Sequence, residues 1–303
     1  MLGYFGPAGT FTHQALRTFS DADATPFATV IQALDAVRSG EVEAALVPIE
    51  NSVEGGVSAT LDNLSMPPTL MIQREVLLPV QFQLCVRPGT RLSDVKRVLT
   101  HPHAAAQVRE WLVTNLPDAH LTEGGSTAAA AEEVSNPGSQ YDAAVCAKVA
   151  GDLYGLDVLA ADIADNSSAV TRFVLVSRPS APPKQTGFDK TTLVAYMFAN
   201  HPGALLEILE QFAGRGVNLC RIESRPTKTG LGDYCFSIDA EGHVLDPRMA
   251  EAVQGLHRIC REVVFLGSYA RADFVRPTVA RGFTDADFKD AATWFKALKN
   301  PDA

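Results

Sequence analysis

The stretch 2–19, LGYFGPAGTFTHQALRTF, sets a pattern that the first half of the chain repeats. Its apolar start is typical of a short strand, residues 6–9 form a tight loop, and Thr10 is a favourable helix N-cap. A second helix is expected after Thr29, and a buried strand over 44–49 follows it. Strands and helices that alternate in this way favour helices layered on both faces of a mostly parallel sheet.

The same alternation continues to about residue 176. Further strands are expected at 80–86, 98–99, 142–145, 158–160 and 173–176, and helices at 103–116, 126–135 and 147–154. The strand over 80–86 is the clearest, because apolar residues alternate with others along it. A segment rich in Pro and polar residues, 177–187, then indicates a linker.

The residues after the linker indicate a second, smaller domain. Strands are expected at 191–198, 218–224, 234–239 and 263–269, with one helix after the first strand and another after the third. The order βαββαβ, over about 80 residues, is the ferredoxin-like arrangement. Thr284 and Asp287 then begin an amphipathic helix near the C-terminus.

The composition excludes several classes of function. The 303 residues carry 26 Lys and Arg against 35 Asp and Glu, a net charge of −9, and 46% of them are hydrophobic, which is typical of a globular protein. The acidic balance argues against nucleic-acid binding. No apolar run reaches the ~18 residues of a membrane span, and the N-terminus does not resemble a signal peptide. We therefore expect a cytoplasmic protein that contacts neither nucleic acid nor membrane.

The cysteine and histidine patterns argue against a disulfide framework and a metal site. The five cysteines are scattered and form no C-x-x-C pair, which is typical of a reducing compartment. His101 and His103 are two residues apart, but no third metal ligand lies near them in the sequence. We therefore expect neither a metal nor a cofactor.

Polar motifs occur next to several of the predicted strands. The loop 6–10 could present backbone N–H groups to an anion. The segment 49–56 places Asn, Ser and two glycines after a strand, where open α/β sheets bind ligands. Thr171-Arg172-Phe173 begins another strand. On spacing alone, a tight turn explains the first motif better and an exposed arginine the third, whereas for the second motif a polar turn that caps a helix is about as good an explanation as a ligand site.

In the second domain, Glu223-Ser224-Arg225-Pro226 closes a predicted strand. Its acid, hydroxyl and base could pair with one another at a solvated edge. They could equally bind the ammonium and carboxylate groups of a free amino acid.

Together and in this order, the motifs resemble those of the prephenate dehydratase family. The catalytic-domain motifs are the stretches 6–12, 49–55 and 171–173, and 100–102 and 154–156 also fit. The stretches 200–206 and 223–226 resemble the family's C-terminal ACT regulatory domain, where the family binds phenylalanine. The resemblance covers residues 1 to about 270.

The resemblance implies an α/β fold in three parts. A two-lobed, periplasmic-binding-protein-like catalytic domain over 1–180 would hold the active site between its lobes. A ferredoxin-like ACT domain would cover 190–270, and 271–303 would be a tail with an amphipathic helix.

The resemblance also implies an activity. The chain would be a hydro-lyase that converts prephenate to phenylpyruvate, with loss of CO2 and water, in L-phenylalanine biosynthesis. L-phenylalanine would be a feedback effector bound where two ACT domains meet, so a homodimer or homotetramer is expected.

The site residues that the resemblance implies fall into three groups. The catalytic residues would be Thr171, Arg172 and Phe173, with Thr171 as a positioned proton donor and Arg172 as a source of positive charge. The substrate-binding residues would be Thr10, Asn51, Ser52, Glu54 and Gly55, with Glu54 as an alternative acid. The effector-binding residues would be Asn200, Gly203, Ala204, Leu205, Glu223, Ser224, Arg225 and Pro226.

Three positions depart from the family's usual pattern. Ala169 stands two residues before Thr171, where the family has Asn, and Thr100 and His103 stand where the family has Ser and Gln. A donor lost at Ala169 could be replaced from within 166–168. Two other functions stay open: an arogenate dehydratase, and an amino-acid sensor without activity, which would have no use for a proton donor at Thr171.

Overall fold

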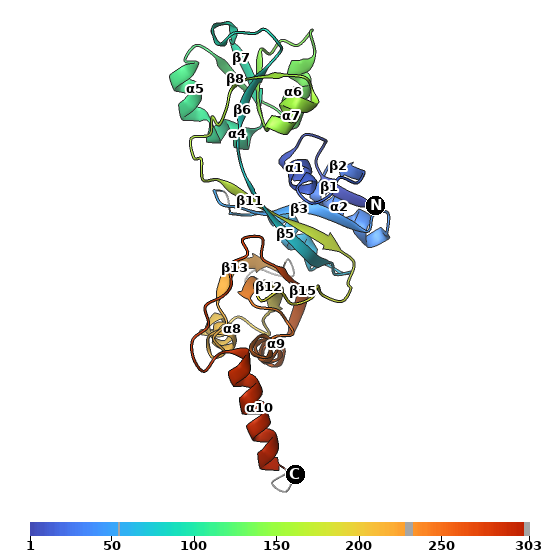
Figure 1. The fold of residues 1–303 in the computed structure, drawn as a ribbon, viewed down its shortest axis with the longest axis vertical. Helices are drawn as coiled ribbons and strands as arrows, with labels where there is room; N and C mark the ends of the chain where they lie inside the picture. Colours follow the sequence, from blue (N-terminus) through green and yellow to red (C-terminus); the bar gives the residue numbers. More distant parts are fainter. Residues whose placement is uncertain (54, 228–232, 300–303) are drawn as a thin grey trace. The chain divides into compact units, whose positions relative to one another are not determined.

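The computed structural model describes residues 1–53, 55–227 and 233–299 (Figure 1). The chain forms two compact units, which are interleaved along the sequence. The first consists of Met1–Thr60 and Val76–Phe173, and the second of Leu61–Glu75 and Val174–Ala303. The domain boundaries 1–180, 190–270 and 271–303 stay predictions.

The first lobe of the first unit is built on a sheet with the order β2-β1-β3-β11-β5, and β4 pairs with β3. Its strands are β1 (Leu2–Phe5), β2 (Ala24–Phe27), β3 (Ala44–Asn51), β4 (Gly55–Gly56), β5 (Met71–Pro79) and β11 (Val170–Ser177). Its helices are α1 (Phe11–Arg17) and α2 (Val30–Ser39), whereas α3 (Ser58–Leu64), β5 and β11 each contain residues of both units. Strand β1 pairs in parallel with both β2 and β3, so the loops after these strands lie at one edge of the sheet.

The second lobe has a sheet with the order β10-β6-β9-β7-β8. Its strands are β6 (Gln83–Val86), β7 (Arg97–Thr100), β8 (His120–Glu123), β9 (Ala143–Cys146) and β10 (Asp157–Ala160), and η1 (Leu92–Asp94) is a short 3-10 turn. Its helices are α4 (Pro102–Gln107), α5 (Arg109–Asn115), α6 (Thr127–Ser135) and α7 (Lys148–Leu153). All four residues of the central strand β9 are buried, which is typical of a strand covered on both faces. These two layered lobes confirm the predicted α/β class.

The predicted helix over 103–116 is two helices, because the chain bends at Val108. The Asp165 carboxylate accepts the N–H groups of Glu110 and Trp111, both at 3.0 Å, and so satisfies the free donors at the start of α5. Asp165 lies 55 residues further along the chain, so the local pattern could not indicate this break.

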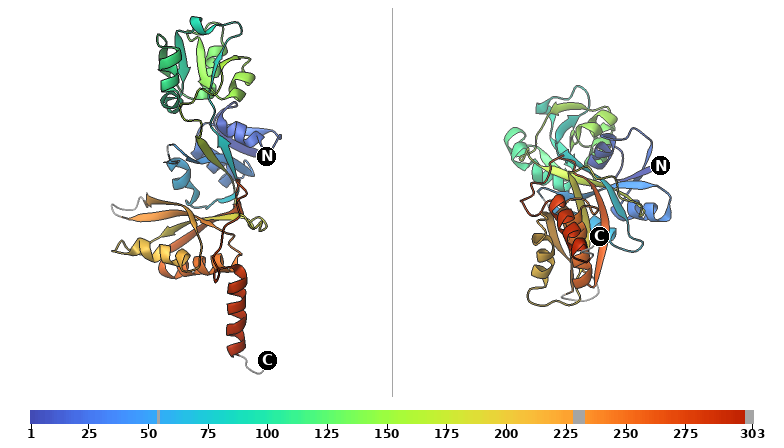
Figure 2. Two further views of the ribbon diagram at one scale, coloured as in Figure 1. Left: turned by 60° about the vertical axis from the view of Figure 1, so that its left-hand side comes forward. Right: turned by 60° about the horizontal axis from the view of Figure 1, so that its bottom comes forward.

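The second unit contains a four-stranded antiparallel sheet with the order β13-β14-β12-β15. The elements follow one another as β12 (Asp189–Tyr196), α8 (Ala204–Ala213), β13 (Leu219–Pro226), β14 (Tyr234–Glu241), α9 (Pro247–Ile259) and β15 (Glu262–Ala270). Helices α8 and α9 bury Ile208, Phe212 and Leu256 against one face of the sheet, over Leu193 and Ile238 (Figure 2). This is the predicted βαββαβ arrangement.

The segment Leu61–Glu75 lies against the other face of this sheet. Asp62 contacts Arg225 at 2.7 Å, Ser65 accepts a hydrogen bond from the Tyr196 hydroxyl at 3.1 Å, and Glu75 contacts Lys190 at 2.9 Å. A Cβ on Gly267 would overlap the backbone of Ile72, so the two backbones approach as closely as glycine allows. A segment far away in the sequence therefore completes the second unit.

The last described element is helix α10 (Asp285–Lys299), which agrees with the predicted C-terminal helix. Within residues 1–53, 55–227 and 233–299, every helix is too short or too polar to cross a bilayer.

Candidate active site

A glycine loop after β1 forms one wall of the site. Gly6 and Gly9 have φ angles of +92° and +85°, a region that favours glycine. Thr10 begins α1: its Oγ1 accepts the N–H of His13 at 3.3 Å and donates to the Pro7 carbonyl at 2.9 Å. The Gly9 N–H donates to His13 Nδ1 at 3.1 Å. The predicted residue Thr10 thus helps to fix the loop, and it also lines the pocket described below.

His13 stabilises the loop through a neutral imidazole ring that accepts a hydrogen bond. Burial, and then the positive charge of Arg17, lower the pKa of His13 from its ordinary value of 6.5. The ring stacks on Tyr4 with a centroid separation of 5.1 Å. A neutral ring can accept the Gly9 N–H at Nδ1, whereas a protonated ring cannot.

Asn51 and Thr171 meet across the first sheet. Asn51 Nδ2 donates to Thr171 Oγ1 at 2.9 Å, and Asn51 Oδ1 accepts the N–H of Val53 at 2.8 Å. The second bond fixes which way the amide of Asn51 faces. Because the Thr171 oxygen accepts from Asn51, its own O–H can be directed to another acceptor.

Ser52 and Gly55 shape the backbone beside this pair. Ser52 exchanges two hydrogen bonds with Val170: its N–H donates to the carbonyl, and its Oγ accepts the N–H, both at 2.9 Å. Gly55 has a φ of +84° and pairs with Asn51 in β4. Ser52 thus holds the end of β3 against β11, and Gly55 pairs the end of β3 with β4, whereas Glu54 lies outside the described residues.

A cavity of about 590 Å³ lies next to Thr171 in the first unit. The first lobe contributes Phe5, Gly6, Pro7, Thr10, Phe11, Thr12, Ala28, Pro48, Asn51, Val57, Thr171 and Phe173. The second lobe, with the segment between β5 and β6 that leads into it, contributes Val80, Phe82, His101, His103, Ala104, Gln107, Gly125, Ser126 and Thr127. Phe11 and Phe82 pack edge to face across the cavity, with centroids 5.5 Å apart. This volume suits one small molecule, held between apolar walls that carry a few polar groups.

Arg172 lies on the opposite side of β11 from Thr171 and Phe173, because side chains alternate along a strand. Its guanidinium is 6% exposed and contacts Glu50 at 3.4 Å. Among the described residues that line the cavity, none is Lys, Arg, Asp or Glu. An anion bound there would therefore be held by neutral donors and by the two histidines.

Several pocket residues were not predicted from the sequence. The clearest is Gln107, whose Oε1 is buried without a hydrogen-bond partner. The ring of His103 lies 4.9 Å from that of His101. His103 and Gln107 are four residues apart, so they share one face of α4. The four-residue spacing of His103 and Gln107, in a helix otherwise rich in alanine, was the one sequence signal that could have indicated these two pocket residues.

Ala169, where the family usually has Asn, is buried in the core of the second lobe. Its carbonyl accepts the N–H of Val80 at 2.8 Å, where the two segments that connect the lobes run side by side. The nearby Asn166 Oδ1 accepts the N–H and the hydroxyl of Ser168.

The predicted effector residues lie in two places of the second unit. Asn200 and Gly203, with a φ of +92°, precede α8, which begins with Ala204 and the half-exposed Leu205. Glu223, Ser224, Arg225 and Pro226 end β13, where Arg225 contacts both Asp62 at 2.7 Å and Glu223 at 3.2 Å. Among the described residues, no cluster of three His, Cys, Asp or Glu side chains suits a metal ion.

The fold and the pocket define a two-lobed α/β enzyme with a small-molecule site between its lobes, followed by a ferredoxin-like unit. The family model described as prephenate dehydratase matches residues 2–181. A prephenate dehydratase from Amycolatopsis methanolica is 49% identical over 98% of this chain and 97% of its own length. The chain belongs to the prephenate dehydratase family, whose members are hydro-lyases, and its lobes confirm the expected periplasmic-binding-protein-like fold.

Two solved structures are also similar over most of the chain. The crystal structure of a prephenate dehydratase from Arthrobacter aurescens, in complex with L-Phe, is 53% identical with a TM-score of 0.93 and covers 98% of this chain and 99% of its own. A protein described as GqqA, a novel type of quorum quenching acylase, is 32% identical with a TM-score of 0.82 and covers 90% of this chain and 98% of its own.

Proposed function

We propose that this chain converts prephenate to phenylpyruvate. The observation that carries the proposal is the bond from Asn51 to Thr171, which holds a hydroxyl at the wall of an apolar pocket with its proton available to a ligand. Thr171 is then a positioned donor to the ring hydroxyl that leaves the substrate.

The reaction needs few groups, because aromatisation of the ring makes it strongly downhill. The bond between the ring and its carboxylate breaks, and that electron pair completes the aromatic ring as the carbon–oxygen bond to the ring hydroxyl breaks. The leaving hydroxide takes up one proton, so prephenate dianion and a proton yield phenylpyruvate, CO2 and water. A threonine hydroxyl is a weak acid, so Thr171 directs the proton rather than supplying a strong acid.

The apolar walls favour loss of the ring carboxylate. Phe82 and Phe173 line the pocket, and a carboxylate beside them loses solvation that the neutral product CO2 does not need. Asn51 and Thr10 would hold the pyruvyl carboxylate through neutral dipoles, with the Thr10 hydroxyl turning from the Pro7 carbonyl to the ligand. Arg172 would then act by fixing Glu50 and the strands that carry Asn51 and Thr171, rather than by touching the substrate.

One assay of the purified chain separates the candidate functions. Prephenate and arogenate are offered separately, and phenylpyruvate and phenylalanine are measured. Phenylpyruvate from prephenate supports the proposal, whereas turnover of arogenate alone identifies an arogenate dehydratase. Binding without turnover of either identifies a sensor. An N-acyl amide substrate belongs in the same assay because of the acylase relative, and cleavage of it alone would overturn the proposal.

We also propose that L-phenylalanine is a feedback effector bound at the ferredoxin-like unit, acting as an ACT domain in a homodimer or homotetramer. The L-Phe complex of the Arthrobacter aurescens relative supports this. Feedback requires that the effector bind two conformations with different affinities. Saturating L-phenylalanine should raise the Tm and lower turnover, and no response in either measurement would refute the proposal. The cytoplasmic location stays a prediction.

A further inference from the structure

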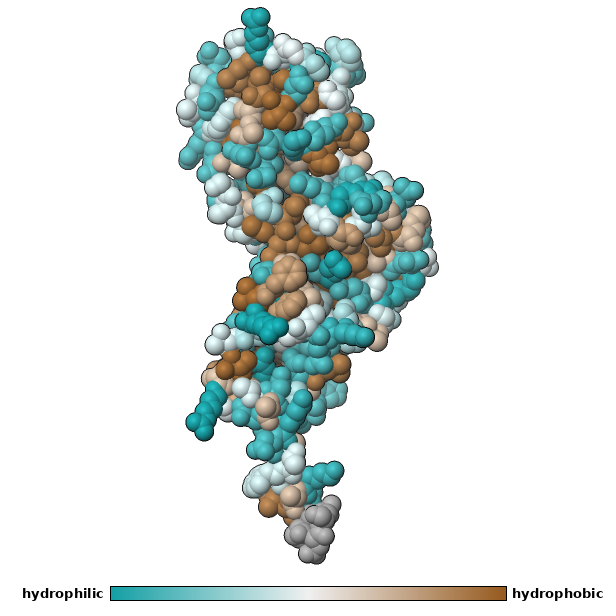
Figure 3. Space-filling view, in the orientation of Figure 1, coloured by the Kyte–Doolittle hydropathy of each residue, from teal (hydrophilic) through white to brown (hydrophobic). Residues whose placement is uncertain are grey.

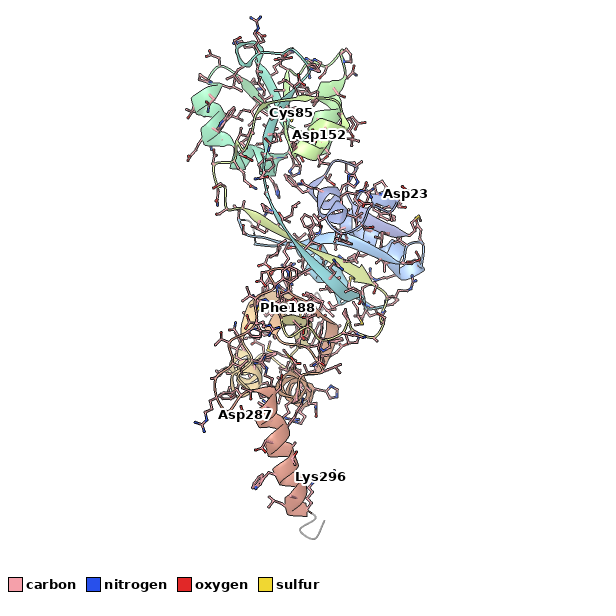
Figure 4. All side chains as sticks on the ribbon, in the orientation of Figure 1. Asp23, Cys85, Asp152, Phe188, Asp287 and Lys296 are labelled. Carbon is pink, nitrogen blue, oxygen red and sulfur yellow. The ribbon has the colours of Figure 1, made fainter. Side chains whose placement is uncertain are left out.

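The start of helix α10 is fixed to the second unit. Phe283 packs on Gly216, and Asp285 lies 3.8 Å from Arg248 of α9. Thr284 and Asp287 form a reciprocal cap, in which the Thr284 hydroxyl donates to Asp287 at 2.6 Å and accepts the Asp287 N–H at 3.2 Å. Figure 4 labels Asp287 near the start and Lys296 near the end of this helix. The direction of α10 is therefore set at its first turn.

The rest of the helix is exposed. Every residue from 291 to 299 is exposed, and Trp294, Phe295 and Leu298 are 63%, 53% and 58% exposed. The surface of α10 in Figure 3 shows apolar and polar residues side by side. A single exposed apolar residue is ordinary, but three within five positions of one helix form a patch.

The apolar residues on one face of α10 are spaced symmetrically along the helix. Phe288, Ala291, Ala292 and Phe295 are spaced three, one and three residues apart, so they share one face with a small pair between two large rings. An antiparallel copy of the helix would place each Phe288 against Phe295 of the other copy. The alanines would lie on the two-fold axis, where small side chains let the backbones approach.

The charges of α10 fit the same arrangement. Residues 285–291 hold three Asp and one Lys, a net charge of 1 − 3 = −2, and residues 292–299 hold two Lys, a net charge of +2. An antiparallel pair brings the acidic half of one helix to the basic half of the other, whereas a parallel pair would oppose like charges.

We propose that α10 packs antiparallel against α10 of a second copy of this chain. Phe288 and Phe295 are the large side chains of the apolar face, and at about 150–250 Å² each they contribute at most ~300–500 Å² per copy. Two copies would bury less than the ~1,200 Å² typical of a stable complex, so α10 joins copies that another surface already holds together. This step rests on the proposed homo-oligomer and makes α10 the contact that turns its dimers into tetramers.

Two matched variants test the proposal in the full-length protein. Ala292→Glu places like charges at the two-fold axis, whereas Ala297→Glu makes the same change on the opposite side of the same helix. By sedimentation velocity over a range of concentrations, Ala292→Glu should shift the protein to a species of half the mass, and Ala297→Glu should match the wild type. Equal masses for all three proteins would overturn the proposal. A wild type that is monomeric throughout would overturn both this contact and the proposed homo-oligomer, and leaves the dehydratase assay unaffected.

A cross-linking experiment tests the direction of packing without destabilising the helix. In the antiparallel pair, residue 292 of one chain lies beside residue 292 of the other, so mild oxidation of the Ala292→Cys variant should link two chains. Ala297→Cys is the matched control, and the wild type corrects for the exposed Cys220. Equal linking of the two variants would contradict the antiparallel contact.

Discussion

At the scale of single residues, the site depends on side chains that orient one another. Asn51 is fixed by the N–H of Val53 and in turn fixes Thr171, so two hydrogen bonds determine where one hydroxyl can donate. The motifs identified both residues but not their contact, because they are 120 positions apart and meet only when β3 and β11 lie in one sheet.

Removal of the Thr171 hydroxyl should slow catalysis. Thr171→Val keeps the shape of the side chain and should lower kcat by roughly 100-fold or more, the usual effect of losing a positioned proton donor. Steady-state kinetics with prephenate measures this. Thr114→Val, on the exposed surface of α5, is the control and should leave kcat unchanged. A Thr171→Val enzyme with near-normal kcat would remove Thr171 from the mechanism.

His13 should make stability depend on pH. Its pKa is lowered by burial and by Arg17, so the folded state favours the neutral ring. The stabilisation from the neutral ring is present above pH 6.5, its ordinary pKa, and is lost as the pH falls from there through the lower pKa of the folded state. Denaturant midpoints measured against pH for wild type and for His13→Gln should diverge in that interval. Curves that stay parallel through it would contradict the role of His13.

At the scale of elements, most of the alternating strands and helices were predictable, but strand β5 was not. The sequence pattern did not indicate β5, which contains Arg74 and Glu75, because buried charges are rare without a partner. The Glu75 carboxylate pairs with Lys190, 115 residues away, and accepts the N–H of Ala272, and these distant partners compensate for its burial. Gln107 was missed for a similar reason: its place in the pocket depends on how the two lobes face each other.

Helix α3 runs from the first unit into the second, so it offers a route from the proposed effector site to the proposed substrate pocket. It begins at Ser58, shortly after the loop that carries Asn51, and Asp62 in its last turn contacts Arg225 of β13. Displacement of β13 would therefore pull on the helix that follows the substrate loop.

Asp62→Asn should weaken feedback without abolishing effector binding. The substitution removes a short ion pair with Arg225 but changes no residue of the pocket. We expect calorimetry to show retained L-phenylalanine binding, while inhibition of turnover falls and basal kcat is preserved. Asp152→Asn breaks an exposed ion pair with Lys148 and should leave inhibition intact. Full inhibition of the Asp62→Asn enzyme would exclude this route.

At the scale of the whole molecule, the net charge of −9 and the lining of the pocket together predict how KM depends on ionic strength. The prephenate dianion is not attracted over long range by a protein of negative net charge, and the described lining of the pocket contains no lysine or arginine. Salt screens exposed charges over ~10 Å at 0.1 M, so it should remove repulsion rather than attraction. The KM for prephenate should stay constant or fall slightly as ionic strength rises. A KM that climbs steeply with salt would indicate a cationic site.

The contact of Leu61–Glu75 with the C-terminal sheet has a consequence for dissecting the protein. A cut after residue 181 follows the family boundary, yet it would remove the partners of Asp62, Ser65 and Glu75 and uncover the segment that bears them. Breaking a buried ion pair such as Glu75–Lys190 costs about 3–5 kcal/mol. A 1–181 fragment should therefore show a lower Tm and faster proteolysis near residue 70 than the intact chain. Because the two units are interleaved along the sequence, one cut cannot separate them, so losing the C-terminal sheet would also destabilise the part of the chain before residue 181.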